Sequence, residues 1–115
     1  MKPEGARQKL LDLFGKQLIF SKEFDKYFSS LKETMQDSFI AWCTDCKEGR
    51  AKGSVPINKD YKDKFVFFRK IAGDIRAVLI KKQNAEFIEV HLVEHKEYDD
   101  IRKMLGYKQS SYYYS

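Results

Sequence analysis

The stretch FVFFRKIAGDIRAVLIKKQNAEFIEVHLV, residues 65–93, decides the fold of this chain. It holds three runs that are rich in β-branched and aromatic residues, and short turn-forming segments separate them. We therefore expect three consecutive antiparallel strands over about 65–68, 75–82 and 86–93, joined by turns at 71–74 and 83–85.

The apolar residues of the last two strands predict their register. If Lys82 pairs with Ala85 across a Gln83-Asn84 loop, one face of the hairpin is wholly apolar and must pack against helices. A shift by one residue would bring Glu89 and His91 into that face. The predicted helix-facing residues are Ile75, Ala77, Leu79, Ile88, Val90 and Leu92. The opposite face carries Arg76, Val78, Ile80, Phe87, Glu89 and His91, with Arg76 and His91 as cross-strand neighbours.

Helical patterns surround these strands. Apolar stripes at Phe24, Phe28 and Leu31, and again from Met35 to Cys46, predict two helices, and Ser21 is a plausible N-cap of the first. In chain order we expect a helix over 6–14, a strand over 17–20, helices over 22–34 and 35–48, a loop over 49–64, the three strands, and a helix over 96–105 that Gly106 caps.

Length and composition indicate one globular domain. The 115 residues are 43% hydrophobic, and they contain no run of the roughly 20 apolar residues that a membrane span needs. The start of the chain lacks the apolar core of a signal peptide, so a cytoplasmic protein without a membrane partner is expected. Within the domain, residues 1–15 form a helical extension and residues 106–115 a flexible tail.

The positive charge is concentrated in one segment. Residues 47–82 hold eleven Lys and Arg against four Asp and Glu, whereas the whole chain has a net charge of only +5. Aromatic residues lie between these bases, which is typical of a surface that binds nucleic acid. The alternative is a solvated, lysine-rich loop and strand edge.

Several kinds of catalytic site are disfavoured. Cys43 and Cys46 form a C-x-x-C pair, but a zinc site needs two more ligands, and the two histidines lie some fifty residues away. We expect helix-packing thiols and no metal. The sequence also lacks a glycine-rich phosphate loop, G-x-S-x-G and H-E-x-x-H, and no cofactor is expected.

The remaining polar residues suit phosphodiester cleavage without a metal. In such a reaction a base takes the ribose 2′-OH proton, cations stabilise the phosphorane, and an acid protonates the leaving 5′-oxygen. His95 could transfer a proton, and Tyr98 could stack on a base. Each residue also has a structural alternative, because His95 could cap a helix, Tyr98 could pack on the sheet, and Arg76 could pair with Glu89. The set is Arg76, His91, His95, Lys96 and Tyr98.

Three segments resemble the RelE/ParE toxin superfamily, nearer its RelE and HigB branches. They are FRKIAGDIRAVLI (68–80), FIEVHLVEHKEYDDI (87–101) and QLIFSKEFDKYFSSL (17–31). The likeness covers about residues 17–105 and includes the terminal H-x-x-Y-D pattern. It implies an α+β fold, with a small twisted antiparallel sheet and two helices packed on one of its faces. It also implies an mRNA endonuclease that acts on the ribosome and is neutralised by a cognate antitoxin.

The resemblance assigns roles to residues of this chain. Arg76 matches the arginine that stabilises the phosphate, and His95 and Tyr98 match the terminal His and Tyr, so these three are the expected catalytic residues. Where RelE-type enzymes have catalytic lysines, this chain has Phe65 and Phe67. The expected RNA-binding residues are Lys62, Lys64, Arg69, Lys70 and His91.

The phenylalanines keep a second hypothesis open. A protein of this fold that has lost the catalytic lysines could bind RNA, or a protein target as gyrase-directed ParE relatives do, without cleaving it. A third hypothesis is a small α+β protein whose sheet face is a dimer contact.

Overall fold

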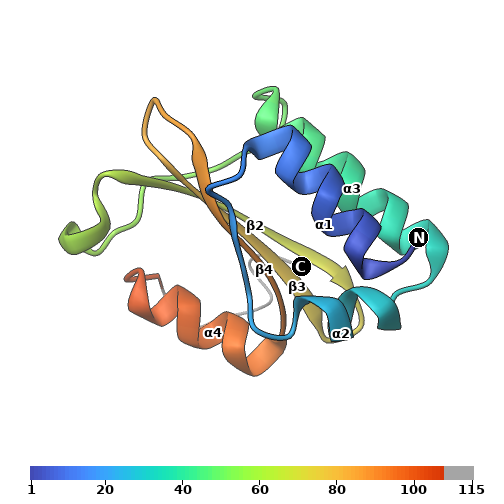
Figure 1. Ribbon diagram of the computed structural model, residues 1–115. Coiled ribbons are helices and arrows are strands. Elements are labelled where there is room, and N and C mark those ends of the chain that lie inside the picture. Colours follow the sequence, from blue (N-terminus) through green and yellow to red (C-terminus); the bar gives the residue numbers. More distant parts are fainter. Residues whose placement is uncertain (108–115) are drawn as a thin grey trace.

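The computed structural model, which describes residues 1–107, has a sheet with helices on both faces (Figure 1). Three helices cover one face: α1 (Pro3–Phe14), α2 (Phe24–Ser30) and α3 (Glu33–Lys47). On the opposite face lies a single helix, α4 (His95–Met104). The predicted α+β class is therefore confirmed, and so is the order of α-helices and strands, but a short 3-10 helix, η1 (Lys59–Tyr61), lies in the segment predicted to be a loop.

The sheet has four strands in the order β1-β4-β3-β2. They are β1 (Ile19–Phe20), β2 (Lys64–Ala72), β3 (Ile75–Lys82) and β4 (Phe87–Glu94). The last three are antiparallel neighbours, as predicted. β1 instead runs parallel to β4, so the sheet is mixed and not wholly antiparallel. The helices α2, α3 and η1 separate β1 from β2, and this long connection lets the chain begin at one edge of the sheet and continue at the other.

The predicted apolar face of the β3–β4 hairpin is largely confirmed, although its pairing is displaced by two residues. Ala77 pairs with Leu92 and Leu79 with Val90, whereas we expected Ala77 opposite Val90. A displacement of two keeps the alternation of side chains between the faces, so these four residues still point to α1, α2 and α3.

An irregularity in β4 makes part of the face prediction wrong. Ile80 pairs with Glu89 but Lys81 with Phe87, so Ile88 is an extra residue in β4. Beyond it the faces exchange, because Phe87 lies in the helix-side core and Ile88 packs with the α4-side cluster.

The displaced register also separates Arg76 from His91. Arg76 pairs with Val93, and His91 pairs with Val78. The two polar residues share a face of the sheet, but they are not the direct cross-strand neighbours that we predicted.

Both faces of the sheet are buried by apolar side chains. On the helix side, Phe24 and Phe28 stack with a centroid separation of 5.8 Å, and Phe67 stacks on Phe87 at 5.7 Å. On the other side, α4 covers a smaller cluster. Its buried members are Val66, Val78, Ile80, Val93, Tyr98 and Leu105.

The predicted N-cap role of Ser21 is wrong. Glu23 occupies the N-cap position of α2, and Ser21 instead binds the backbone of β4. Its N–H donates to the carbonyl of Val90 at 3.0 Å, and its Oγ accepts from the N–H of Leu92 at 3.1 Å. Ser21 thus extends the contact of the two-residue strand β1 with β4. The helix predicted over 22–34 also ends early, at Ser30, and α3 begins at Glu33.

The loop that precedes β2 fastens the C-terminal end of α4. Asn58 donates from its backbone N–H to the carbonyl of Leu105 at 2.9 Å and from Nδ2 to that of Met104 at 3.0 Å. Gly106, with a φ of 90°, ends the helix: its N–H reaches the carbonyl of Lys103, and the N–H of Tyr107 reaches that of Arg102. We call this arrangement the Asn58 clasp.

Tyr107, which we assigned to the flexible tail over 106–115, contacts the loop that precedes β2. Tyr107 is fixed by its hydroxyl, which donates to the carbonyl of Val55 at 3.1 Å and lies 2.7 Å from the hydroxyl of Ser54. Residues 108–115 lie outside the part of the chain that the structure describes.

Substituting Gly106 tests the clasp. A Cβ on Gly106 would lie 2.6 Å from the backbone nitrogen of Asn58, whereas one on Gly49, with a φ of 77°, meets nothing within 4 Å. Both Gly→Ala changes carry the left-handed backbone penalty of about 1–2 kcal/mol. We expect Gly106→Ala to lower the free energy of unfolding by about 1–3 kcal/mol more than Gly49→Ala does, because the new methyl group overpacks against the backbone of Asn58. Urea titration followed by Trp42 fluorescence measures the difference, and equal losses for the two variants would contradict the clasp.

Candidate functional site

At the end of the sheet that carries the β2–β3 turn, Arg76 lies close to the beginning of α4. Ile75 pairs with Glu94, the last residue of β4, and His95 follows directly as the first residue of α4. Arg76 is 7% exposed, and its Nη1 donates to the carbonyl of Gly73 at 2.7 Å. The guanidinium is therefore held against the β2–β3 turn, at the end of the sheet where α4 starts.

His95 contacts a carboxylate one helical turn later. Its Nε2 lies 3.4 Å from Oδ2 of Asp99, and the side chains are 40% and 12% exposed, respectively. The i, i+4 spacing places the Asp99 carboxylate beside the imidazole on one side of α4. Asp99 was missed by the sequence analysis. The i, i+4 spacing from His95 on a predicted helix is the signal that could have found it.

Lys70 adds a second cation to this end of the sheet. It is the cross-strand partner of Arg76, so the two side chains share the face of the sheet that carries α4. Like charges directly opposite one another destabilise a pair of strands. An anion bound between Lys70 and Arg76 would remove this repulsion. We call Lys70, Arg76, His95 and Asp99 the turn-end cluster.

Tyr98 is not exposed at this cluster. It is fully buried, and its ring meets that of Phe68 edge-on with a centroid separation of 5.7 Å. The Arg102 guanidinium carbon lies 5.8 Å from the Tyr98 centroid and 5.2 Å from that of Phe68. These contacts pack α4 onto β2, which is the structural alternative for Tyr98. A ring in this position has no face on which a nucleobase could stack.

Arg69 lies on the other side of the sheet. Successive side chains of a strand point to opposite faces, so Arg69 points to the α3 side while Lys70 points to the α4 side. Arg69 is near enough to Cys46 of α3 to affect its thiol. Burial, followed by the charge of Asp45, raises the pKa of Cys46 to about 12, and the positive charge of Arg69 opposes this rise. The structure therefore does not bring Arg69 together with Arg76.

Lys62 and Lys64 lie at the far end of β2. Lys64 is six residues from Lys70, which corresponds to roughly 20 Å along a strand. Its ammonium is 2.8 Å from a carboxylate oxygen of Asp63. The predicted RNA-binding lysines therefore fall into two groups at opposite ends of the sheet.

His91 occupies a groove between β4 and α4. Its Nε2 lies 2.8 Å from Oε1 of Glu89, and this hydrogen bond lowers the pKa of the Glu89 carboxyl against the opposing effect of burial. Glu89 thus pairs with His91. The structural alternative for Arg76, pairing with Glu89, is therefore wrong. The groove is lined by Ser21, Lys22, His91, Val93, Glu97, Asp100 and Ile101.

The positions expected for catalytic lysines are part of the hydrophobic core. Phe67 is buried and stacks on Phe87, and Phe65 packs on Phe67 edge-on at 5.3 Å. Both phenylalanines point to the helix side, opposite to the turn-end cluster. No cation from these two positions can reach a phosphate held by Arg76.

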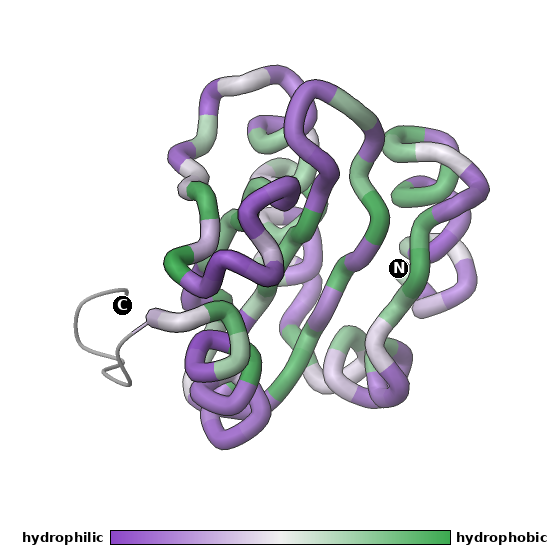
Figure 2. The backbone as a smooth tube through the Cα atoms, turned by 90° about the vertical axis from the view of Figure 1, so that its left-hand side faces the viewer, coloured by the Kyte–Doolittle hydropathy of each residue, from purple (hydrophilic) through white to green (hydrophobic). Residues whose placement is uncertain are grey.

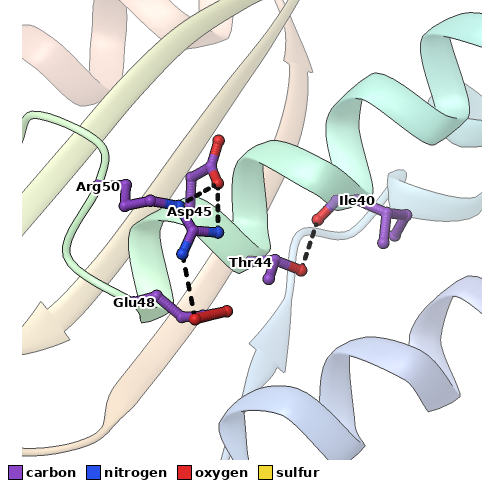
Figure 3. Close-up of polar contacts among 5 residues, drawn as sticks. All are labelled: Ile40, Thr44, Asp45, Glu48 and Arg50. Carbon is purple, nitrogen blue, oxygen red and sulfur yellow. Dashed lines mark hydrogen bonds and ion pairs between the residues drawn. The ribbon is translucent and has the colours of Figure 1, made fainter.

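The C-x-x-C pair lies inside the regular helix α3. Thr44, between the two cysteines, donates to the carbonyl of Ile40 at 3.2 Å (Figure 3). Nearby, Arg50 is paired with Asp45 at 2.8 Å and Glu48 at 3.1 Å, so this base of the positive segment already has acidic partners (Figure 3). Within residues 1–107, no group of three or more His, Cys, Asp or Glu side chains could hold a metal ion.

Burial makes both thiols poor nucleophiles. It raises the pKa of Cys46 to about 12 and that of Cys43 well above its usual range. At mildly alkaline pH we expect the folded protein to react with Ellman's reagent on the order of a hundredfold more slowly than the urea-unfolded chain, in which both thiols are accessible. Rapid reaction of either thiol in the folded state would contradict the packing of α3.

Comparison with known proteins leaves the site to be interpreted from its geometry. The chain matches no protein-family model, no curated protein and no solved structure. No helix in the described part of the chain has the length and apolar character needed to cross a membrane.

Proposed function

We propose that this chain is the toxin of a toxin–antitoxin pair, a metal-independent endoribonuclease that cleaves mRNA on the ribosome in the cytoplasm. The observation that carries the proposal is the contact of His95 with Asp99 at the end of the sheet where Lys70 and Arg76 are paired. A proton-transfer group and two cations at one end of a sheet are suited to a phosphodiester substrate. The resemblance of residues 17–105 to RelE-type toxins supports the same substrate.

The cleavage reaction needs a proton removed and a proton supplied. A base takes the proton of a ribose 2′-OH, and the 2′-oxygen then bonds to the adjacent phosphorus. As the bond from phosphorus to the 5′-oxygen breaks, an acid protonates that oxygen, so the products carry a 2′,3′-cyclic phosphate and a 5′-hydroxyl. In this proposal His95 transfers one of these protons, a solvent water molecule transfers the other, and Arg76 and Lys70 stabilise the negative phosphorane.

Two residues support the site without touching the substrate. Asp99 orients the His95 imidazole, and Tyr98 holds α4 on β2 through Phe68. Tyr98 is thus reassigned from base stacking to positioning of α4. A cognate antitoxin would be needed to hold such an activity in check in the cell that makes it.

A second candidate function is binding without cleavage. Phe65 and Phe67 point into the helix-side core, and Lys64 lies roughly 20 Å from Lys70 along β2. The turn-end cluster therefore lacks the additional lysines of RelE-type sites. This favours a protein that binds RNA, or a protein target, through the same fold and leaves it intact.

Expression without an antitoxin tests the first function. We expect the chain to arrest growth and fragment cellular mRNA. His95→Gln removes the proton-transfer group and should reduce the cleavage rate by about 10²–10⁴-fold, measured by primer extension on a translated message. Arg76→Ala removes the phosphate contact, and Arg76→Lys keeps its charge if the alanine variant fails to fold. Lys9→Gln, on α1 across the sheet, is the matched control and should retain activity.

Two outcomes separate the candidates. Unimpaired growth with intact mRNA, from a chain that is folded by circular dichroism, contradicts the nuclease proposal. If that chain still binds RNA in a salt-dependent manner, the non-cleaving candidate is supported instead.

A further inference from the structure

The tip of the β3–β4 hairpin carries a hollow that the turn-end cluster does not use. It is lined by Phe65, Lys81, Gln83 and Asn84, and its volume is about 250 Å³. Phe65 is partly exposed here, although its ring packs on Phe67 and against Gly53. A partly exposed aromatic ring beside two amides and a lysine is a combination that binds single-stranded nucleic acid.

The hairpin tip is fixed to the segment before β2. The backbone N–H of Gln83 donates to the carbonyl of Asp63 at 2.8 Å, and its side-chain amide donates to that of Lys62. Asn84 adopts a φ of 57°, in the left-handed region that asparagine tolerates well. Most residues of the tip are hydrophilic, and the backbone at the top of Figure 2 is mostly purple. The hollow is therefore built by contacts between two segments and not by a single loop.

The charges at the tip favour an anionic partner. Lys64 is the direct cross-strand partner of Lys82, so a second like-charged pair lies on the same face as Lys70 and Arg76. The carboxylate of Asp63 neutralises only part of this positive charge. Lys64 donates a hydrogen bond to it, and this bond, together with the charge of Lys82, lowers the pKa of Asp63. Lys62 adds a further cation, while Lys81 pairs with Phe65 on the helix side, where its ammonium lies 5.2 Å from the centroid of the Phe87 ring.

The two like-charged pairs lie at opposite ends of the β2–β3 ladder. Six residues separate Lys64 from Lys70 and Arg76 from Lys82, which is roughly 20 Å. A small anion could contact only one pair. A polymer with regularly spaced phosphates could contact both.

We propose that the β3–β4 tip is a second RNA-binding surface, in which Phe65 stacks on a base of single-stranded RNA and Lys81 and Lys82 contact its phosphates. The inference rests on the proposed function in taking RNA as the partner, but it needs no cleavage. The strand would pass around the end of the hairpin, from Phe65 and Lys81 on the helix side to Lys82 on the α4 side, and the turn-end cluster would act on a nucleotide roughly 20 Å from Lys82.

Binding of a non-cleavable RNA tests this surface. The probe is a fluorescein-labelled single-stranded oligouridine with 2′-O-methyl riboses, titrated with the full chain at several salt concentrations and followed by fluorescence anisotropy. Lys81→Gln combined with Lys82→Gln should lower the slope of log affinity against log salt by about 1.4, since each phosphate contact to a single strand contributes about 0.7. Phe65→Leu should weaken binding on the order of tenfold.

The control is a second double lysine variant, at the N-terminal half of α1. Lys2→Gln combined with Lys9→Gln removes the same charge from α1 and its N-cap and should leave the slope within about 0.3 of wild type, since neither lysine belongs to either proposed RNA contact. Equal slopes for the two double variants, or wild-type protein that does not bind the probe, would overturn the second surface. Binding that depends on Lys81 and Lys82 in a chain that cuts no mRNA would support the surface and reject the nuclease.

Discussion

The fold depends on the burial of β3 on both of its faces. Ala77 and Leu79 are completely buried against the three-helix layer, while Val78 is completely buried and Ile80 nearly so beneath α4. Each large apolar side chain buried in this way contributes about 1.5–3 kcal/mol, so exposing either face would cost a large part of the stability of a small domain. This constraint leaves polar side chains only at the two ends of the strand, Arg76 and Lys81-Lys82, and both proposed RNA contacts lie there.

Alternation along the strands explains which features could be predicted. The period-two pattern of IRAVLI identifies the face of each residue, and that assignment survives a displacement of the register by two. It cannot identify the partner of a residue, because the loop length and the extra residue at Ile88 decide the pairing. The predicted proximity of Arg76 and His91 failed for this reason, since it required a specific partner.

The candidate site was only partly predictable for a similar reason. Arg76, Lys70 and His95 do lie at one end of the sheet, where strand order alone would place them. Burial of Tyr98 depends on how α4 crosses β2, and its contact with Phe68 involves residues thirty positions apart. Asn58 shows the same limit: a residue in a loop without any periodic pattern satisfies the last carbonyl groups of α4. Such contacts follow from tertiary packing and leave no local signal in the sequence.

The central claim is that RNA is cut by attack of its own 2′-oxygen at the turn-end cluster. The chemical nature of the new RNA ends tests this claim most directly. Ribosomes translating a defined message are incubated with the purified chain, and the fragments are analysed by mass spectrometry. The account predicts 2′,3′-cyclic phosphate at the upstream end and a 5′-hydroxyl at the downstream end. A 3′-hydroxyl with a 5′-phosphate, the signature of attack by water, would contradict it, and so would an intact message.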